Sequence, residues 1–82
     1  MAPRAKKDNE LAACVRRVLE TYFRDLDGEA PHAVYEMVLH CVERPLLESV
    51  LEYAEGNQTR AAEVLGMNRN TLRKKMKTYG LQ

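Results

Sequence analysis

The segment 31–55 constrains the fold more than any other part of this chain. A helix over this range has apolar residues around most of its circumference: Val34, Tyr35, Met37, Val38, Leu39, Cys41, Val42, Leu46, Leu47, Val50, Leu51, Tyr53 and Ala54. Such a helix must be buried on several sides. A chain of 82 residues with one other long helix cannot supply that cover, so the pattern predicts a second copy of the chain.

The stretch before this segment also has a helical pattern. Leu11, Val15, Val18, Tyr22 and Leu26 follow one another at spacings of three and four, which predicts an amphipathic helix over about 10–26. Gly28 is suited to the left-handed conformation at its end, and Pro31 is suited to the first turn of the next helix. Two such helices from each of two subunits would make a four-helix bundle.

Two shorter helices are predicted in the last third of the chain. Asn57 is a good N-cap for a helix over about 58–65, and Gly66 would end that helix. Asn68 is a good N-cap for a helix over about 69–79, and Gly80 would end it. No strand pattern occurs, so the predicted fold class is all-α, with four helices per chain. The expected organisation is a flexible basic tail (1–9), dimerisation helices (10–55) and a helix-turn-helix (56–82).

The net charge of +1 conceals an uneven distribution. Residues 1–7 carry +3, residues 8–55 carry four basic and eleven acidic residues, or −7, and residues 56–82 carry six basic residues and one acid, or +5. This asymmetry predicts that the last third binds a polyanion. The basic tail fits two roles equally, contact with flanking DNA or simple solubility.

In the predicted helix-turn-helix, one face is apolar and the other polar. Ala61 and Ala62 are small enough to let the first helix approach the second closely. The expected buried seam consists of Leu65, Met67, Leu72, Met76 and Tyr79. The opposite face of the last helix carries Asn70, Lys74 and Lys77, with Thr71 and Arg73 on its flanks and Asn68 and Arg69 at its tip. A recognition helix directs its N-terminal residues at base edges in the major groove, so this face predicts binding to double-stranded DNA.

Side-chain chemistry assigns roles within this surface. Arg69 can donate two hydrogen bonds to guanine, and Lys74 can reach base edges or phosphates. Phosphate contacts are expected from Arg73, Lys75 and Lys77. Asn57 and Thr59 are placed to hold a phosphate at a helix N-terminus, where Arg60 adds a charge.

Other kinds of site find little support. Metal-ligand spacing is lacking among Cys14, Cys41, His32 and His40. The two cysteines lie on apolar helix faces and are expected in the core, and His40 is expected in solvent beside Glu36 and Glu43. The carboxylates of 36–55 have no pocket or base partner and are expected to form a solvated acidic face, so no enzyme is predicted. No cofactor is expected. No apolar run reaches the roughly 18 residues that a membrane span requires.

The segment GNQTRAAEVLGMNRNTLRKKMKTYGL resembles the DNA-binding end of the Fis family, the bacterial nucleoid-associated factors for inversion stimulation. The resemblance extends upstream through VERPLLESVLEYAEGN and TYFRDLDGE and covers about residues 10–82. It implies a cytoplasmic, nucleoid-bound homodimer whose first two helices interlock, and which binds and bends degenerate, partly palindromic DNA sites in transcription regulation and chromosome organisation. It also implies base readers at Asn68, Arg69 and Lys74, and backbone contacts from Asn57, Thr59, Arg60, Thr71, Arg73 and Lys75.

Three features depart from the family pattern. No hairpin pattern occurs in MAPRAKKDN, which argues against contact with a recombinase, whereas RNA polymerase is a candidate partner. Glu55 stands where the best-known Fis has an arginine aimed at flanking DNA, so wrapping of the flanks is expected to be weaker. The segment RNTL at 69–72 resembles the C-terminal domain of NtrC-type activators, which leaves an enhancer-binding domain as the alternative function.

Overall fold

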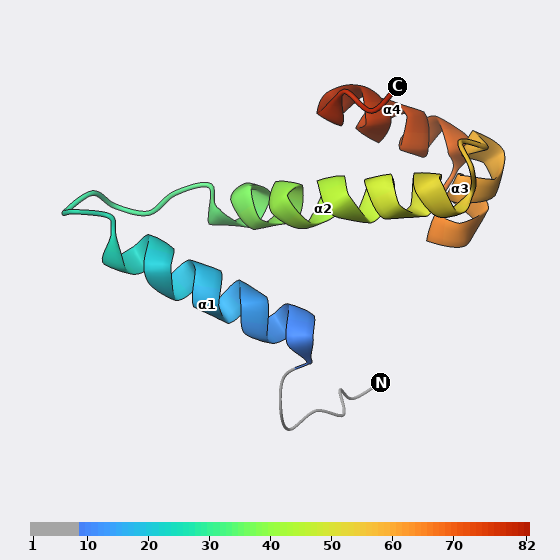
Figure 1. The fold of residues 1–82 in the computed structure, drawn as a ribbon. Helices are drawn as coiled ribbons and strands as arrows, with labels where there is room; N and C mark the ends of the chain where they lie inside the picture. The colour runs from blue at the N-terminus through green and yellow to red at the C-terminus, as the bar shows by residue number, and fades with distance from the viewer. Residues whose placement is uncertain (1–8) are drawn as a thin grey trace. The chain divides into compact units, whose positions relative to one another are not determined.

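A computed structural model describes residues 9–82, which form four helices and no strand (Figure 1). The helices are α1 (Glu10–Arg24), α2 (Val34–Tyr53), α3 (Gln58–Leu65) and α4 (Arg69–Tyr79). The all-α prediction is therefore confirmed, and α3 and α4 have the predicted bounds. The predicted tail, apart from Asn9, lies outside the described residues. None of the described helices is both long and apolar enough to cross a membrane.

The chain divides into two compact units, Met1–Val38 and Leu39–Gln82. In the first unit, α1 begins where the Asn9 side chain accepts a hydrogen bond of 2.8 Å from the backbone N–H of Ala12. It ends at Arg24, two residues before the predicted end, and the N–H of Asp25 closes it on the carbonyl of Thr21. The next residues form a turn in which Asp27 and Gly28 have positive φ values of 56° and 92°, which a helix cannot accommodate.

The beginning of α2 differs from the prediction. Pro31 lies outside the helix, which begins at Val34. The reason is the backbone of Ala33, whose φ of 55° is incompatible with a helix continuing from Pro31. The carbonyl of Ala33 accepts the N–H of Met37 at 3.0 Å and so makes the first hydrogen bond of the helix. At the other end, Glu55 adopts a φ of 54°, and α2 ends at Tyr53 rather than at residue 55.

Much of the apolar surface of α1 and α2 is uncovered in the single chain. No residue of α1 is buried, and Leu11 is 58% exposed. On α2, Tyr35 is 77% and Leu46 is 46% exposed. The prediction that Cys14 and Cys41 are core residues is wrong for the single chain, where both are exposed free thiols.

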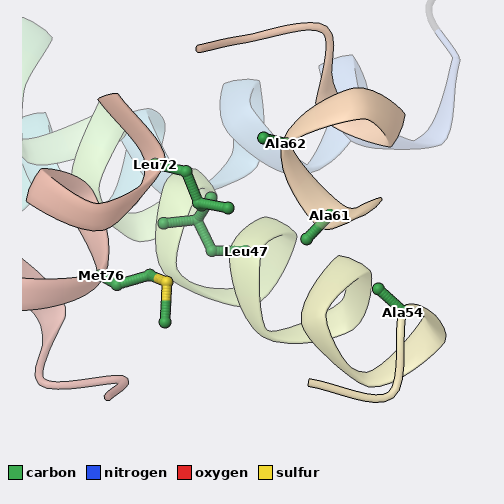
Figure 2. Packing of buried hydrophobic residues seen from close by; sticks show 6 residues of the cluster. All are labelled: Leu47, Ala54, Ala61, Ala62, Leu72 and Met76. Atoms are coloured by element: carbon green, nitrogen blue, oxygen red, sulfur yellow. The ribbon is translucent and has the colours of Figure 1, made fainter. Parts of the chain in front are cut away.

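The second unit has a core of its own, made where α3 and α4 pack against α2. Leu47 of α2 and Leu72 of α4 are fully buried, and Figure 2 shows their side chains next to each other. The other buried members are Ala54, Ala61, Ala62 and Met76. Leu65, Met67 and Tyr79 are partly buried against them, so every residue of the predicted seam belongs to this core. As Figure 1 shows, α4 runs back along α2 from the turn that follows α3.

Candidate nucleic-acid interface

The turn between α3 and α4 is built by local hydrogen bonds. Gly66 has a left-handed φ of 77°, and its N–H is donated to the carbonyls of Ala62 and Glu63. The N–H of Met67 also reaches the carbonyl of Ala62, at 3.0 Å, which completes a Schellman motif. The side chain of Asn68 then accepts the N–H of Asn70 at 2.7 Å and begins α4. Because Met67 packs against the core, the turn fixes α4 relative to α3.

The first turn of α3 holds three of the predicted DNA contacts. The side-chain oxygen of Asn57 accepts the N–H of Arg60 at 3.0 Å, so the predicted N-cap is confirmed and this oxygen is occupied. Arg60 places its guanidinium 5.4 Å from the centre of the Tyr53 ring, which fits a cation–π contact. Thr59 is exposed beside them. The structure therefore brings Asn57, Thr59 and Arg60 together at one helix end.

The other seven predicted contacts lie on α4 or at its cap. Asn70, Arg73, Lys74 and Lys77 line one open depression of about 410 Å³ together with Gln82, so they share a face as predicted. Asn68, Arg69 and Thr71 are exposed at the N-terminal end of the same helix. The opposite side of α4 carries the buried Leu72 and Met76. One face of α4 thus serves the core, and the other offers cations and amides to solvent.

Lys75 differs from the other basic residues of α4. Its ammonium lies 2.8 Å from one carboxylate oxygen of Glu43 on α2, and its side chain is only 32% exposed. The hydroxyl of Tyr79 donates a hydrogen bond of 2.6 Å to the other oxygen of the same carboxylate. The hydrogen bond from Lys75, and to a smaller extent the one from Tyr79, holds the pKa of Glu43 below its ordinary value of 4.5. The pKa of Tyr79 is raised to about 12, mainly because the hydroxyl is partly removed from water and secondly because it is hydrogen-bonded to Glu43.

Two further residues of α2 hold the same end of α4. Arg44 donates a hydrogen bond of 2.7 Å to the backbone carbonyl of Tyr79. Its guanidinium also lies 3.5 Å from the carboxylate of Glu48. The ring of His40 meets the Tyr79 ring edge-on, with 5.6 Å between their centres. We refer to Glu43, Arg44, His40, Lys75 and Tyr79 as the α2–α4 clamp.

The α2–α4 clamp was missed by sequence reasoning. The expectation that Glu43 belongs to a solvated acidic face is wrong, because its side chain is only 16% exposed and has two partners. His40 is exposed, but it contacts Tyr79 rather than solvent alone. A signal existed in the spacing, since Lys75 and Tyr79 are four residues apart and so share one helix face. Nothing in the sequence indicated which α2 carboxylate would meet them.

The similarity of this chain to known proteins extends over most of its length. The family described as "Bacterial regulatory protein, Fis family" matches residues 39–79. A protein of Ralstonia nicotianae described as Fis-like and DNA-binding is 59% identical over 73 residues, which cover 89% of this chain and 95% of the relative. One of Neisseria meningitidis with the same description is 54% identical over 88% of this chain and 91% of its own length. The "DNA-binding protein Fis" of Glaesserella parasuis is 49% identical over 90% of this chain and 76% of its own length.

Proposed function

The chain belongs to the Fis family of bacterial regulatory proteins, which are DNA-binding regulators and not enzymes, and we propose that it is a homodimer that binds and bends DNA. Its sites are degenerate and partly palindromic, and it acts on the bacterial nucleoid in transcription regulation and chromosome organisation. The similarity to the Ralstonia relative extends over 73 residues, far beyond the helix-turn-helix. This extent favours the proposal over the alternative of an NtrC-type enhancer-binding domain.

The observation that carries the proposal is the exposed face of α4. Asn70, Arg73, Lys74 and Lys77 lie together on it, behind the exposed tip at Arg69. In our proposal this helix enters the major groove, where Asn68, Arg69 and Lys74 contact bases. The residues proposed for the sugar–phosphate backbone are Asn57, Thr59, Arg60, Thr71, Arg73, Lys75 and Lys77.

The proposed homodimer accounts for the uncovered apolar surface of α1 and α2. Leu11, Val18 and Phe23 of α1 are 48–58% exposed, and Tyr35 and Leu46 of α2 are also exposed. Burial of apolar surface is the main favourable contribution to most protein association, so a second copy that covers these faces would stabilise both chains. Two recognition helices on one dimer also match a partly palindromic site. Bending of the duplex would let both helices reach adjacent major grooves.

The dimer is tested by sedimentation equilibrium of the free protein. We expect a single species of twice the chain mass at micromolar concentration, with helical circular dichroism. Replacement of the exposed Leu11 by Asp should shift this equilibrium towards monomer, because it places a charge in the proposed interface. A folded monomer at these concentrations would contradict the proposal.

DNA binding is tested by gel-shift titration at two salt concentrations. Arg60, Arg73, Lys75 and Lys77 from two subunits supply about eight phosphate contacts, and release of the corresponding counterions predicts an affinity loss of about 10⁴ between 50 and 200 mM salt. Lys77→Gln removes two of these contacts from the dimer, so its slope of log K against log salt should be shallower by about 1.8. Dimerisation without DNA binding would mark the chain as a protein-interaction module instead.

A further inference from the structure

The α2–α4 clamp joins the proposed recognition helix to a helix that has no proposed contact with DNA. Glu43 lies on α2, and each of its two carboxylate oxygens is bound by a different residue of α4, Lys75 at 2.8 Å and Tyr79 at 2.6 Å. Arg44, the next residue of α2, binds the Tyr79 carbonyl at 2.7 Å. Successive residues of α2 therefore hold both the side chains and the backbone at the C-terminal end of α4.

These polar contacts constrain the helix in a way that the core does not. Leu72 and Met76 rest on Leu47 through apolar contacts, which are non-directional and allow a helix to tilt or roll. Hydrogen bonds depend on distance and angle, so the bonds to Glu43 and Arg44 oppose both movements. The distance along α4 from Met76 to Arg69 is about 10 Å, and a tilt of about 5° at Met76 would move the Arg69 end by about 1 Å. A shift of that size is enough to spoil a two-bond contact with a base edge.

We propose that Glu43 is a positioning residue for DNA recognition, which sets the orientation of α4 through Lys75 and Tyr79 without touching DNA. The inference rests on the proposed function, because it requires α4 to be the element that reads DNA. It also gives Lys75 a place in the α2–α4 clamp in addition to any phosphate contact.

Electrostatics alone predicts the opposite effect of removing this carboxylate. Glu43→Gln deletes one negative charge and frees the Lys75 ammonium, and both changes would strengthen attraction to phosphate. Loss of positioning instead weakens binding to the preferred sequence. The direction of the change in affinity therefore separates the two explanations.

The experiment compares full-length wild type, Glu43→Gln and Tyr79→Phe by fluorescence anisotropy. The probes are the duplex that wild type selects from a random-sequence pool and an unselected duplex of equal length. Glu52→Gln is the matched control, because it removes the same charge from an exposed position on α2. Tyr79→Phe keeps the ring and all charges but deletes the hydroxyl that donates a hydrogen bond to Glu43.

We expect Glu43→Gln to bind the selected duplex about five- to tenfold more weakly than wild type and the unselected duplex with equal or higher affinity. Tyr79→Phe should show a smaller loss of the same kind, and Glu52→Gln none. A fall in the folded fraction would lower binding to both duplexes alike, so the ratio between them reports positioning. If Glu43→Gln and Glu52→Gln bind the selected duplex with equal affinity, the proposal is overturned.

NMR titration of ring-labelled tyrosine tests the contact itself, without DNA. The Tyr79 pKa of about 12 should fall towards its ordinary value of 10 in Glu43→Gln, because one of its causes is the bond to this carboxylate. An unchanged Tyr79 titration would show that the contact is not formed in solution and would also overturn the proposal. Failure of wild type to bind either duplex would instead refute the proposed function.

Discussion

Replacing Leu47 by Ala is expected to destabilise the unit of residues 39–82 by about 2–5 kcal/mol. Leu47 is fully buried between α2, α3 and α4, so the change removes apolar contacts and leaves a cavity beside Leu72. Small domains are stable by only about 5–15 kcal/mol, and a loss of this size is a large share of the total. The measurement is urea denaturation followed by circular dichroism at 222 nm, at one protein concentration for all variants.

Val64→Ala is the control for this prediction. Val64 lies on α3 in the same unit and is 50% exposed, so its truncation leaves no cavity. Alanine also has the higher helix propensity, and we expect a change within about 0.5 kcal/mol. Equal denaturation midpoints for wild type and Leu47→Ala would show that the described core does not hold the three helices together.

Arg69→Ala is expected to abolish the preference for a guanine in each half-site and to leave salt-sensitive binding to DNA of any sequence. Arg69 is exposed at the first position of α4, where a guanidinium can donate two hydrogen bonds to O6 and N7 of guanine. Such a pair contributes about 1–3 kcal/mol of discrimination, or roughly five- to 150-fold per half-site. Competition between duplexes with guanine and with adenine at each candidate position measures this preference.

Arg73→Ala serves as the comparison, since Arg73 is proposed to contact phosphate. Its loss should weaken binding to all sequences by a similar factor and make the salt dependence shallower, with sequence preference unchanged. If Arg69→Ala gives this uniform pattern instead, Arg69 does not read a base. If it has no effect on any duplex, Arg69 lies outside the interface.

The parts of the fold that were predicted correctly depend on short-range interactions. The bounds of α3 and α4 follow from Asn57, Asn68 and Gly66, whose contacts span at most five residues. The part of this core that α3 and α4 contribute also followed from the sequence, because the spacing of Leu72 and Met76 places them on one face of any helix that contains both. Leu47 and Ala54 were expected to be covered by a second copy of the chain, whereas they are buried in the core that α2 forms with α3 and α4 of the same chain. The wrong helix start at Pro31 has a local cause as well, since an alanine is not expected to adopt the positive φ observed at Ala33.

The candidate DNA-binding face could be predicted for the same reason. Helical periodicity alone puts Asn70, Arg73 and Lys77 on the side of α4 opposite its apolar residues, and the structure places them around one depression. What periodicity does not reveal is the environment of each charge. Lys75 and Lys74 are adjacent residues of the same type, yet among the described residues Lys75 has a carboxylate at 2.8 Å and Lys74 has none.

Four helices, the caps of α3 and α4, the apolar seam and the basic face follow from local sequence, because each of these depends on residues within a turn or two of one another. Which carboxylate of α2 meets Lys75 and Tyr79 depends on how the helices pack, and the structure shows that it is Glu43. These partners lie more than 30 residues away, and their meeting depends on the path of the chain through two turns. The local sequence determines which face of a helix a side chain occupies, whereas its partner on another helix is determined only when the helices pack.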